Sequence, residues 1–199
     1  MVKNHLHFKI YKPFGMLSQL STNSTKEKRK RFLSELFDFP NGIMPIGRLD
    51  EKSEGLLLLT TDGKLSDTIN RSGIEKQYYV LLDGEITDEA IVLLKKGVEI
   101  GFNGKKYQTK SCDVHRLETE PKLPQPDKRI RIARPRHRPN SWISVTITEG
   151  KFRQVRKMTS AVGFPTLRLV RIRIGNIYLN DMYVEEVVSL TNLEKYFQE

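Results

Sequence analysis

The stretch from residue 43 to residue 63 reads IMPIGRLDEKSEGLLLLTTDG. Residues 43–46 and 55–60 are apolar runs of strand length, and a helix is predicted over residues 64–70. The loop between the two runs is charged and contains Arg48, Asp50, Glu51, Lys52 and Glu54. A loop at a strand edge is where side chains can reach a ligand. By local physics alone, however, a solvated turn is the favoured interpretation of this loop.

Outward from this stretch, predicted strands and helices alternate without a regular βαβ rhythm. Alternation of Leu6, Phe8 and Ile10 with polar residues indicates a strand. Further strands are predicted over residues 76–82, 98–117 (around the Asn103-Gly104 turn), 142–147 and 164–174. Helices are predicted over residues 28–37, 88–96 and 152–162, and in part of 185–197. The pattern favours an α+β fold with a mixed, mainly antiparallel sheet and flanking helices.

The chain length suits one domain or two closely joined halves that share a core. The clearest break is at residues 120–140, where five prolines are mixed with basic residues. We expect an exposed, mobile loop there.

Positive charge is concentrated in the C-terminal half. The net charge is +10, yet residues 121–140 hold seven basic residues and one acid, and residues 151–173 hold seven basic residues and no acid. Two dense clusters of one sign favour a polyanionic partner, most often a phosphate backbone, over a merely solvated surface. An anionic membrane fits less well, because neither cluster resembles a basic amphipathic helix.

Several classes of protein are disfavoured. Cys112 is the only cysteine, so a disulfide within the chain is impossible and a thiolate zinc site is not expected. His5 and His7 could share a strand face, but two imidazoles alone make a poor metal site. No apolar run has the roughly 20 residues of a membrane span, and the N-terminus lacks a signal sequence. We expect a cytoplasmic protein that does not associate with membranes.

Two further segments carry residues suited to chemistry. Residues 149–158 read EGKFRQVRKM, which places Arg153, Arg156 and Lys157 on one helical face near a helix start. Cations there oppose the helix dipole, so an anionic partner is plausible. Residues 76–80 read KQYYV, and Tyr78 and Tyr79 point to opposite strand faces. One could face a cleft, or both could pack on the sheet.

These segments together resemble the ribosomal RNA pseudouridine synthases of the small-subunit-enzyme type. The resemblance covers GRLD at 47–50 with GLLLLTTDG at 55–63, YKPFG at 11–15, KQY at 76–78, and 149–158 followed by AVGFPTLRLVR at 161–171. The four blocks occur in the family's order. Ser53 stands where threonine is common, which keeps the hydroxyl. The similarity is strongest to a large-subunit branch that lacks an N-terminal S4 domain. It implies a single catalytic domain over 1–199, a central active-site cleft and no S4 domain.

The resemblance also implies the chemistry: a specific uridine of large-subunit (23S) ribosomal RNA is isomerised to pseudouridine after base flipping. No cofactor or metal is needed, because atoms and redox state are conserved. Asp50 would be the catalytic carboxylate, which stabilises charge at the sugar, adds to C1′ or takes a sugar proton. Arg156 would pair with Asp50, Tyr78 would stack on the uracil, and Leu169 would pack beneath the base.

RNA would then be bound by the catalytic domain itself. Arg48 is expected to fill the gap left by the flipped base or to grip a flanking phosphate. We expect Lys12, Arg153 and Lys157 to bind the RNA backbone. The basic loop is expected to do the same through Arg129, Arg131, Arg134 and Arg136. We expect a monomer.

Two rival functions remain. A non-catalytic RNA-binding or ribosome-assembly module would explain the basic clusters but not the joint presence of Asp50, Tyr78 and Arg156. An unrelated carboxylate-dependent hydrolase is disfavoured, because no second carboxylate stands out as an acid/base partner.

Overall fold

The computed structural model describes residues 4–130, 132 and 139–197, and these form two compact units. Unit 1 comprises residues 1–74 and 171–199, and unit 2 comprises residues 75–170, as far as each is described. The division therefore falls at 74/75 and 170/171, and the proline-rich stretch 120–140 lies inside unit 2. Arg131, Arg134 and Arg136 lie outside the described residues.

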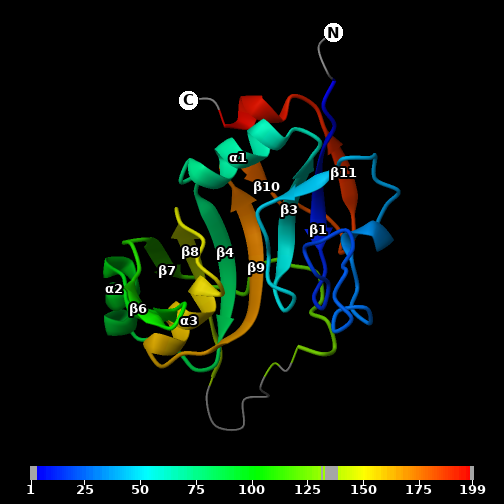
Figure 1. Cartoon of the computed structure of the whole chain (residues 1–199). Helices are drawn as coiled ribbons and strands as arrows, with labels where there is room; N and C mark the ends of the chain where they lie inside the picture. The colour runs from blue at the N-terminus through cyan, green and yellow to red at the C-terminus, as the bar shows by residue number, and fades with distance from the viewer. Residues whose placement is uncertain (1–3, 131, 133–138, 198–199) are drawn as a thin grey trace. The chain divides into compact units, whose positions relative to one another are not determined.

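Unit 1 is built around an entirely buried strand. β3 (Glu54–Thr60) pairs antiparallel with β1 (His7–Lys12) and β2 (Met44–Ile46), and β1 also pairs with β11 (Val187–Leu190) (Figure 1). Leu56, Leu57, Leu58 and Leu59 have no exposed surface. An apolar run with no polar alternation is what a strand covered on both faces requires.

One helix packs against this part of the sheet. α1 (Gly63–Arg71) contacts β2 and β3, and the carboxylate of Asp62 caps it by accepting hydrogen bonds from the N–H groups of Lys64 and Leu65. Unit 1 also holds the short strand β10 (Ile177–Tyr178), which pairs with the end of β9 (Thr166–Ile174).

Unit 2 contains a second group of antiparallel strands. β8 (Ser141–Ile147) pairs with β4 (Lys76–Leu82) and with β7 (Asp113–Arg116). β5 (Glu99–Phe102) and β6 (Lys105–Gln108) form a separate hairpin. α2 (Asp88–Lys96) contacts β7, and α3 (Gln154–Ala161) contacts β5. The α+β class with a mainly antiparallel sheet is therefore confirmed.

The helix predicted over residues 28–37 was wrong. Residues 28–37 contain only a short 3-10 helix, η1 (Leu33–Glu35), because the backbone of this segment bonds elsewhere: Leu17 N–H donates to the Arg31 carbonyl, and Leu33 N–H donates to the Gln19 carbonyl. The C-terminal segment is partly helical as expected, because β11 precedes a second 3-10 helix, η2 (Leu193–Tyr196). No helix in the described part of the chain is long and apolar enough to span a bilayer.

Candidate active site

Asp50 lies in the loop between β2 and β3, as the sequence predicts, and its side chain is partly buried. The loop begins at Gly47, which adopts a φ of +68° and has Asn70 Oδ1 within 3.0 Å of where a Cβ would lie. Glycine is therefore required at this turn. Arg48 is exposed, whereas Leu49 is buried and anchors the loop in the core. Ser53 N–H closes the loop by donating to the Asp50 carbonyl over 3.0 Å.

The segment that follows β1 holds this loop. The Ser18 hydroxyl donates to the Leu49 carbonyl over 2.8 Å and accepts from the Leu49 N–H over 3.0 Å. Gly15 N–H donates to the Glu51 carbonyl over 2.8 Å. The Lys30 ammonium pairs with the Glu51 carboxylate at 2.7 Å. The residues on both sides of Asp50 are thus fixed by Gly15, Ser18 and Lys30, which follow β1.

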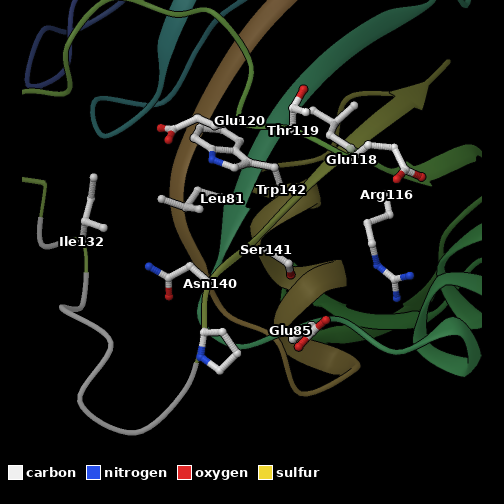
Figure 2. Close-up of a pocket in the computed structure, with 12 residues that line it drawn as sticks. Leu81, Glu85, Arg116, Glu118, Thr119, Glu120, Ile132, Asn140, Ser141 and Trp142 are labelled. Atoms are coloured by element: carbon white, nitrogen blue, oxygen red, sulfur yellow. The ribbon is translucent and has the colours of Figure 1, made fainter.

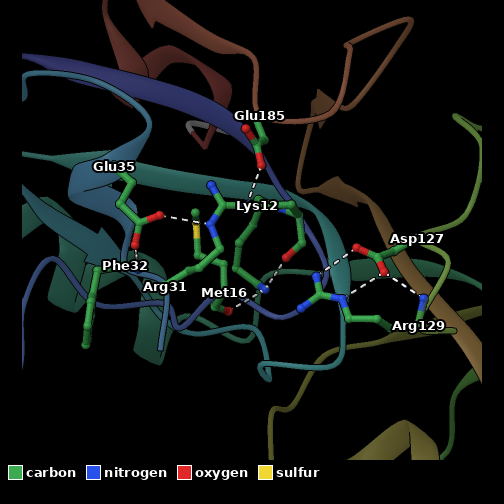
Figure 3. A network of polar contacts seen from close by, with 9 residues as sticks. Lys12, Met16, Arg31, Phe32, Glu35, Asp127, Arg129 and Glu185 are labelled. Carbon is green, nitrogen blue, oxygen red and sulfur yellow. Dashed lines mark hydrogen bonds and ion pairs between the residues drawn. The ribbon is translucent and has the colours of Figure 1, made fainter. Parts of the chain in front are cut away.

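Lys12 is fully buried, which the sequence reasoning did not anticipate. Its Nζ donates to the carbonyls of Pro13 (2.8 Å) and Met16 (2.7 Å), as Figure 3 shows. This placement corrects the expectation that Lys12 binds the RNA backbone, because a phosphate cannot reach a side chain with no exposed surface. Lys12 instead ties together the turn that supports the Asp50 loop.

Buried charges surround this lysine. The pKa of Lys12 is lowered to about 7, mainly by burial and also by the charge of Arg171, although the carboxylates of Glu54, Asp50 and Glu51 act to raise it. Glu54 and Arg171 are each only 2% exposed, and Arg171 Nε donates to the Leu56 carbonyl over 2.7 Å. Asp50 is therefore part of a cluster of charged side chains that includes both cations and carboxylates.

Tyr78 and Leu169 lie in unit 2 and are both buried. Tyr78 pairs with Val145 in the register of β4 and β8, and Tyr79, on the opposite face of the strand, is half-buried. The adjacent Gln77 amide donates to the Ser144 hydroxyl over 2.8 Å, which fixes this part of the ladder.

Arg156 is a residue of α3, and this helix sets the position of its side chain. Its guanidinium donates to the Thr166 carbonyl over 3.3 Å, and the hydroxyls of Thr159 and Thr166 lie 2.8 Å apart. Arg153 precedes the helix with a φ of +53°, a left-handed conformation that is uncommon outside glycine and asparagine. The first residues of α3 are thus joined to the start of β9.

The three predicted cations of α3 do share one surface. Arg153, Arg156 and Lys157 line a groove of about 380 Å³ between α3 and β5. Lys157 Nζ donates to the Gly101 carbonyl over 2.7 Å, which joins the helix to the hairpin. The expectation that these side chains lie on one face is confirmed, while their RNA contacts stay a prediction.

The turn before α3 is held by Glu149. Its carboxylate accepts hydrogen bonds from the Tyr107 hydroxyl (2.6 Å), the Lys110 N–H (2.9 Å) and the Gln154 amide (2.6 Å). Burial alone would raise the pKa of Glu149, but these hydrogen bonds and the charge of Lys151 leave that pKa below its ordinary value. The β5–β6 hairpin is therefore fastened to the helix that carries Arg156.

The remaining predicted RNA contact that can be described is Arg129. Its guanidinium pairs with Asp127, with N–O distances of 2.9 and 2.7 Å (Figure 3). A larger hollow in unit 2, of about 550 Å³, is lined by Leu81, Trp142 and other residues shown in Figure 2. Its charged lining residues are Glu85, Glu118, Glu120 and Arg116, an excess of acid that disfavours phosphate there.

The sequence reasoning missed the supporting residues Ser18, Glu54 and Tyr107. Glu54 could have been suspected, because it directly precedes a fully apolar strand. Ser18 and Tyr107 gave no such signal, since their partners lie 31 and 42 residues away along the chain.

The chain is similar to known pseudouridine synthases in sequence and in fold. Residues 7–161 match the RNA pseudouridylate synthase family. "Ribosomal large subunit pseudouridine synthase E" of Xanthomonas campestris is 43% identical over 168 residues, which cover 83% of this chain and 85% of that protein. The protein of the same name from Vibrio parahaemolyticus is 34% identical over 173 residues, covering 86% and 68%.

A solved structure described as a pseudouridylate synthase extends the comparison to the fold. It superposes with a TM-score of 0.75 at 25% sequence identity, and the match covers 97% of this chain and 73% of that one. The family implied by the four sequence blocks is thus confirmed by sequence and by fold. The chain belongs to the RNA pseudouridylate synthase family and is an RNA pseudouridine synthase, an isomerase.

Proposed function

We propose that this enzyme isomerises a specific uridine of large-subunit (23S) ribosomal RNA to pseudouridine, with Asp50 as the catalytic carboxylate. The observation that carries the assignment of Asp50 is the way its loop is held. The carboxylate is partly exposed, whereas the neighbouring backbone is fixed through Leu49 and Glu51. A pre-positioned carboxylate is what a reaction at the sugar carbon requires. The names of the relatives support the choice of RNA.

The reaction breaks the bond between C1′ and the uracil nitrogen, and then joins C1′ to a uracil carbon. Positive charge develops at the sugar as the first bond breaks, and a nearby carboxylate stabilises it. Asp50 serves this step by charge stabilisation, by adding to C1′ or by taking a sugar proton. Glu51 and Glu54 are less suited: Glu51 is paired with Lys30, and Glu54 is buried.

We assign three residues of unit 2 to the same reaction. Arg156 pairs with the Asp50 carboxylate and orients it. Tyr78 stacks on the uracil and assists proton transfer at its carbon. Leu169 packs beneath the base. The joint action of these residues with Asp50 distinguishes a catalyst from a module that only binds RNA.

The target nucleotide must leave its stack to reach Asp50. Arg48 is exposed in the same loop, so it is suited to fill the gap or to grip a flanking phosphate. Arg153 and Lys157, with the basic loop that includes Arg129, Arg131, Arg134 and Arg136, bind the backbone. We further propose that the enzyme acts as a monomer in the cytoplasm, with no cofactor or metal.

The test is tritium release from ribosomal RNA labelled at carbon 5 of uracil. The native protein should release tritium, and Asp50→Asn should abolish release while RNA affinity stays within about twofold. Asp38→Asn is a matched control, because Asp38 is an exposed carboxylate of the same unit, and it should retain full activity. Equal activity of Asp50→Asn and native protein would rule out the proposed role.

The rival function, a non-catalytic RNA-binding module, makes a different prediction in the same assay. It requires that the native protein bind ribosomal RNA without any tritium release from free RNA or from assembling particles. Mapping pseudouridines in cells that lack the protein would then identify the target position if the enzyme is active.

A further inference from the structure

Phe152 is unusually exposed for a phenylalanine. It lies in the turn before α3, between Lys151 and Arg153, and 66% of its surface is open to solvent. Lys157 Nζ lies 5.4 Å from the centre of its ring, and Lys157 also lines the groove between α3 and β5. The aromatic face and the cationic groove are therefore neighbours on one surface of unit 2.

The positive charge around this surface is not balanced by nearby acidic residues. The hairpin 99–108 and the segment 149–161 contain six basic residues and two acidic ones. Both acids are already engaged: Glu99 pairs with Lys106 at 2.9 Å, and Glu149 accepts three hydrogen bonds. The surplus positive charge makes an anionic ligand the natural partner.

The surface is also held in shape. Lys151 Nζ lies over the rings of Phe102 (5.4 Å) and Tyr107 (4.9 Å). Lys157 donates to the Gly101 carbonyl, which uses one of the three N–H groups of its ammonium. Because the cations are already ordered, a ligand would lose less conformational entropy on binding than at a flexible patch.

We propose that this surface binds an unpaired segment of the RNA substrate next to the target uridine, with one base stacked on Phe152 and the adjoining phosphates held by Arg153 and Lys157. An exposed aromatic ring beside ordered cations suits a ligand that alternates flat bases with phosphates. Arg156 follows Phe152 by four residues, so the proposed binding surface is next to the proposed catalytic arginine in the sequence. The inference rests on the proposed function and adds the recognition of flanking sequence.

The experiment measures the affinity of the full chain for a short fluorescein-labelled oligouridine by anisotropy. Phe152→Ala should weaken binding about tenfold, because the variant removes the aromatic face on which one base stacks. Phe152→Leu should be as weak, because it keeps apolar bulk without an aromatic face, and Phe152→Trp should restore affinity. Tyr183→Ala is the control, because Tyr183 is 79% exposed but lies in unit 1.

Two further measurements separate stacking from charge. A single-stranded RNA that contains 2-aminopurine should lose fluorescence on binding to the native protein, and this quenching should be absent with Phe152→Ala. Lys157→Gln should remove about one phosphate contact. The plot of log affinity against log salt concentration should become less steep by the corresponding amount. Thermal melts of each variant show whether the fold is retained.

The outcomes are distinguishable from those of the proposed function. Native tritium release with unchanged oligouridine affinity in Phe152→Ala would overturn this inference and leave the enzyme assignment intact. An equal loss of affinity for fully paired RNA would also overturn it, because a paired base cannot stack on Phe152. Absence of tritium release by the native protein would instead contradict the proposed function.

Discussion

The hydroxyl of Ser18 satisfies both backbone groups of Leu49, donating to its carbonyl over 2.8 Å and accepting from its N–H over 3.0 Å. Ser18 is 5% exposed and Leu49 is 6% exposed, so water cannot easily replace this pair of bonds. Because Leu49 immediately precedes Asp50, a single hydroxyl positions the backbone that carries the proposed catalytic carboxylate.

Ser18→Ala should therefore lower both stability and turnover. Two buried backbone groups lose their partner, which costs about 1–3 kcal/mol in the free energy of unfolding. We expect kcat to fall about tenfold or more in tritium release, with little change in RNA affinity. Ser21→Ala, at an exposed position nearby, is the control. A variant with normal kcat would mean that the Asp50 loop is positioned without Ser18.

Stability should depend on pH through Lys12. Its folded pKa of about 7 lies below the ordinary value of 10.5, so between these two values the unfolded chain binds more protons than the folded one. The free energy of unfolding should then rise as pH increases from about 7 to about 10, by at most about 1.4 kcal/mol per pH unit, with no contribution to the slope well below pH 7. Urea unfolding at a series of pH values measures this slope.

Lys12→Met provides the comparison for that slope. The variant leaves the carbonyls of Pro13 and Met16 without their donor, so it should be less stable than the native protein at every pH. Its stability should rise less steeply between pH 7 and pH 10. If the free energy of unfolding rises equally steeply with pH in the two proteins, the lysine does not titrate in this range.

Tyr107→Phe should loosen the turn that leads into α3. The variant removes the 2.6 Å hydrogen bond to Glu149 but keeps the ring beneath Lys151. We expect a loss of about 1 kcal/mol in the free energy of unfolding and faster amide hydrogen exchange over residues 149–153. Tyr178→Phe, at a half-exposed tyrosine of unit 1, should change neither. Unaltered exchange in 149–153 would show that the hydrogen bond from Tyr107 to Glu149 does not hold this turn.

Gly97→Ala should be strongly destabilising. Gly97 ends α2 with a φ of +91°, and a Cβ there would lie 2.2 Å from the Thr109 carbonyl oxygen. The clash and the backbone strain together should cost more than about 2 kcal/mol. Gly104→Ala is the matched comparison, because Gly104 also has a positive φ but has no atom within 4 Å of the added Cβ. Thermal melts should show the smaller loss for Gly104→Ala.

Most strands and helices follow from local sequence signals, because those signals and the tertiary structure agree. The apolar run before Thr60 forms a buried strand, Thr87 and Gly97 bound α2, and Asn103-Gly104 forms the hairpin turn with both residues at positive φ. The helix predicted over residues 28–37 does not form, because the Arg31 carbonyl and the Leu33 N–H bond to residues 17 and 19.

Motif order predicted Asp50, Tyr78 and Arg156 as site residues, which stays a prediction, while burial could not be judged from the motifs. Lys12 shares a strand face with Phe8 and Ile10, a spacing that hints at burial. Its charge nevertheless suggested a phosphate ligand. Only the tertiary structure shows that Lys12 has no exposed surface and that its ammonium donates to two backbone carbonyls.

The sequence by itself determined the family and the α+β class and predicted the central carboxylate, because these depend on residue types at short, ordered spacings. Tertiary structure alone decided which charges are supports and which can meet RNA. Ser18 and Leu49, or Tyr107 and Glu149, are far apart in the chain and meet only when the strands pair. Burial and long-range hydrogen bonds are properties of that pairing, and no local pattern encodes them.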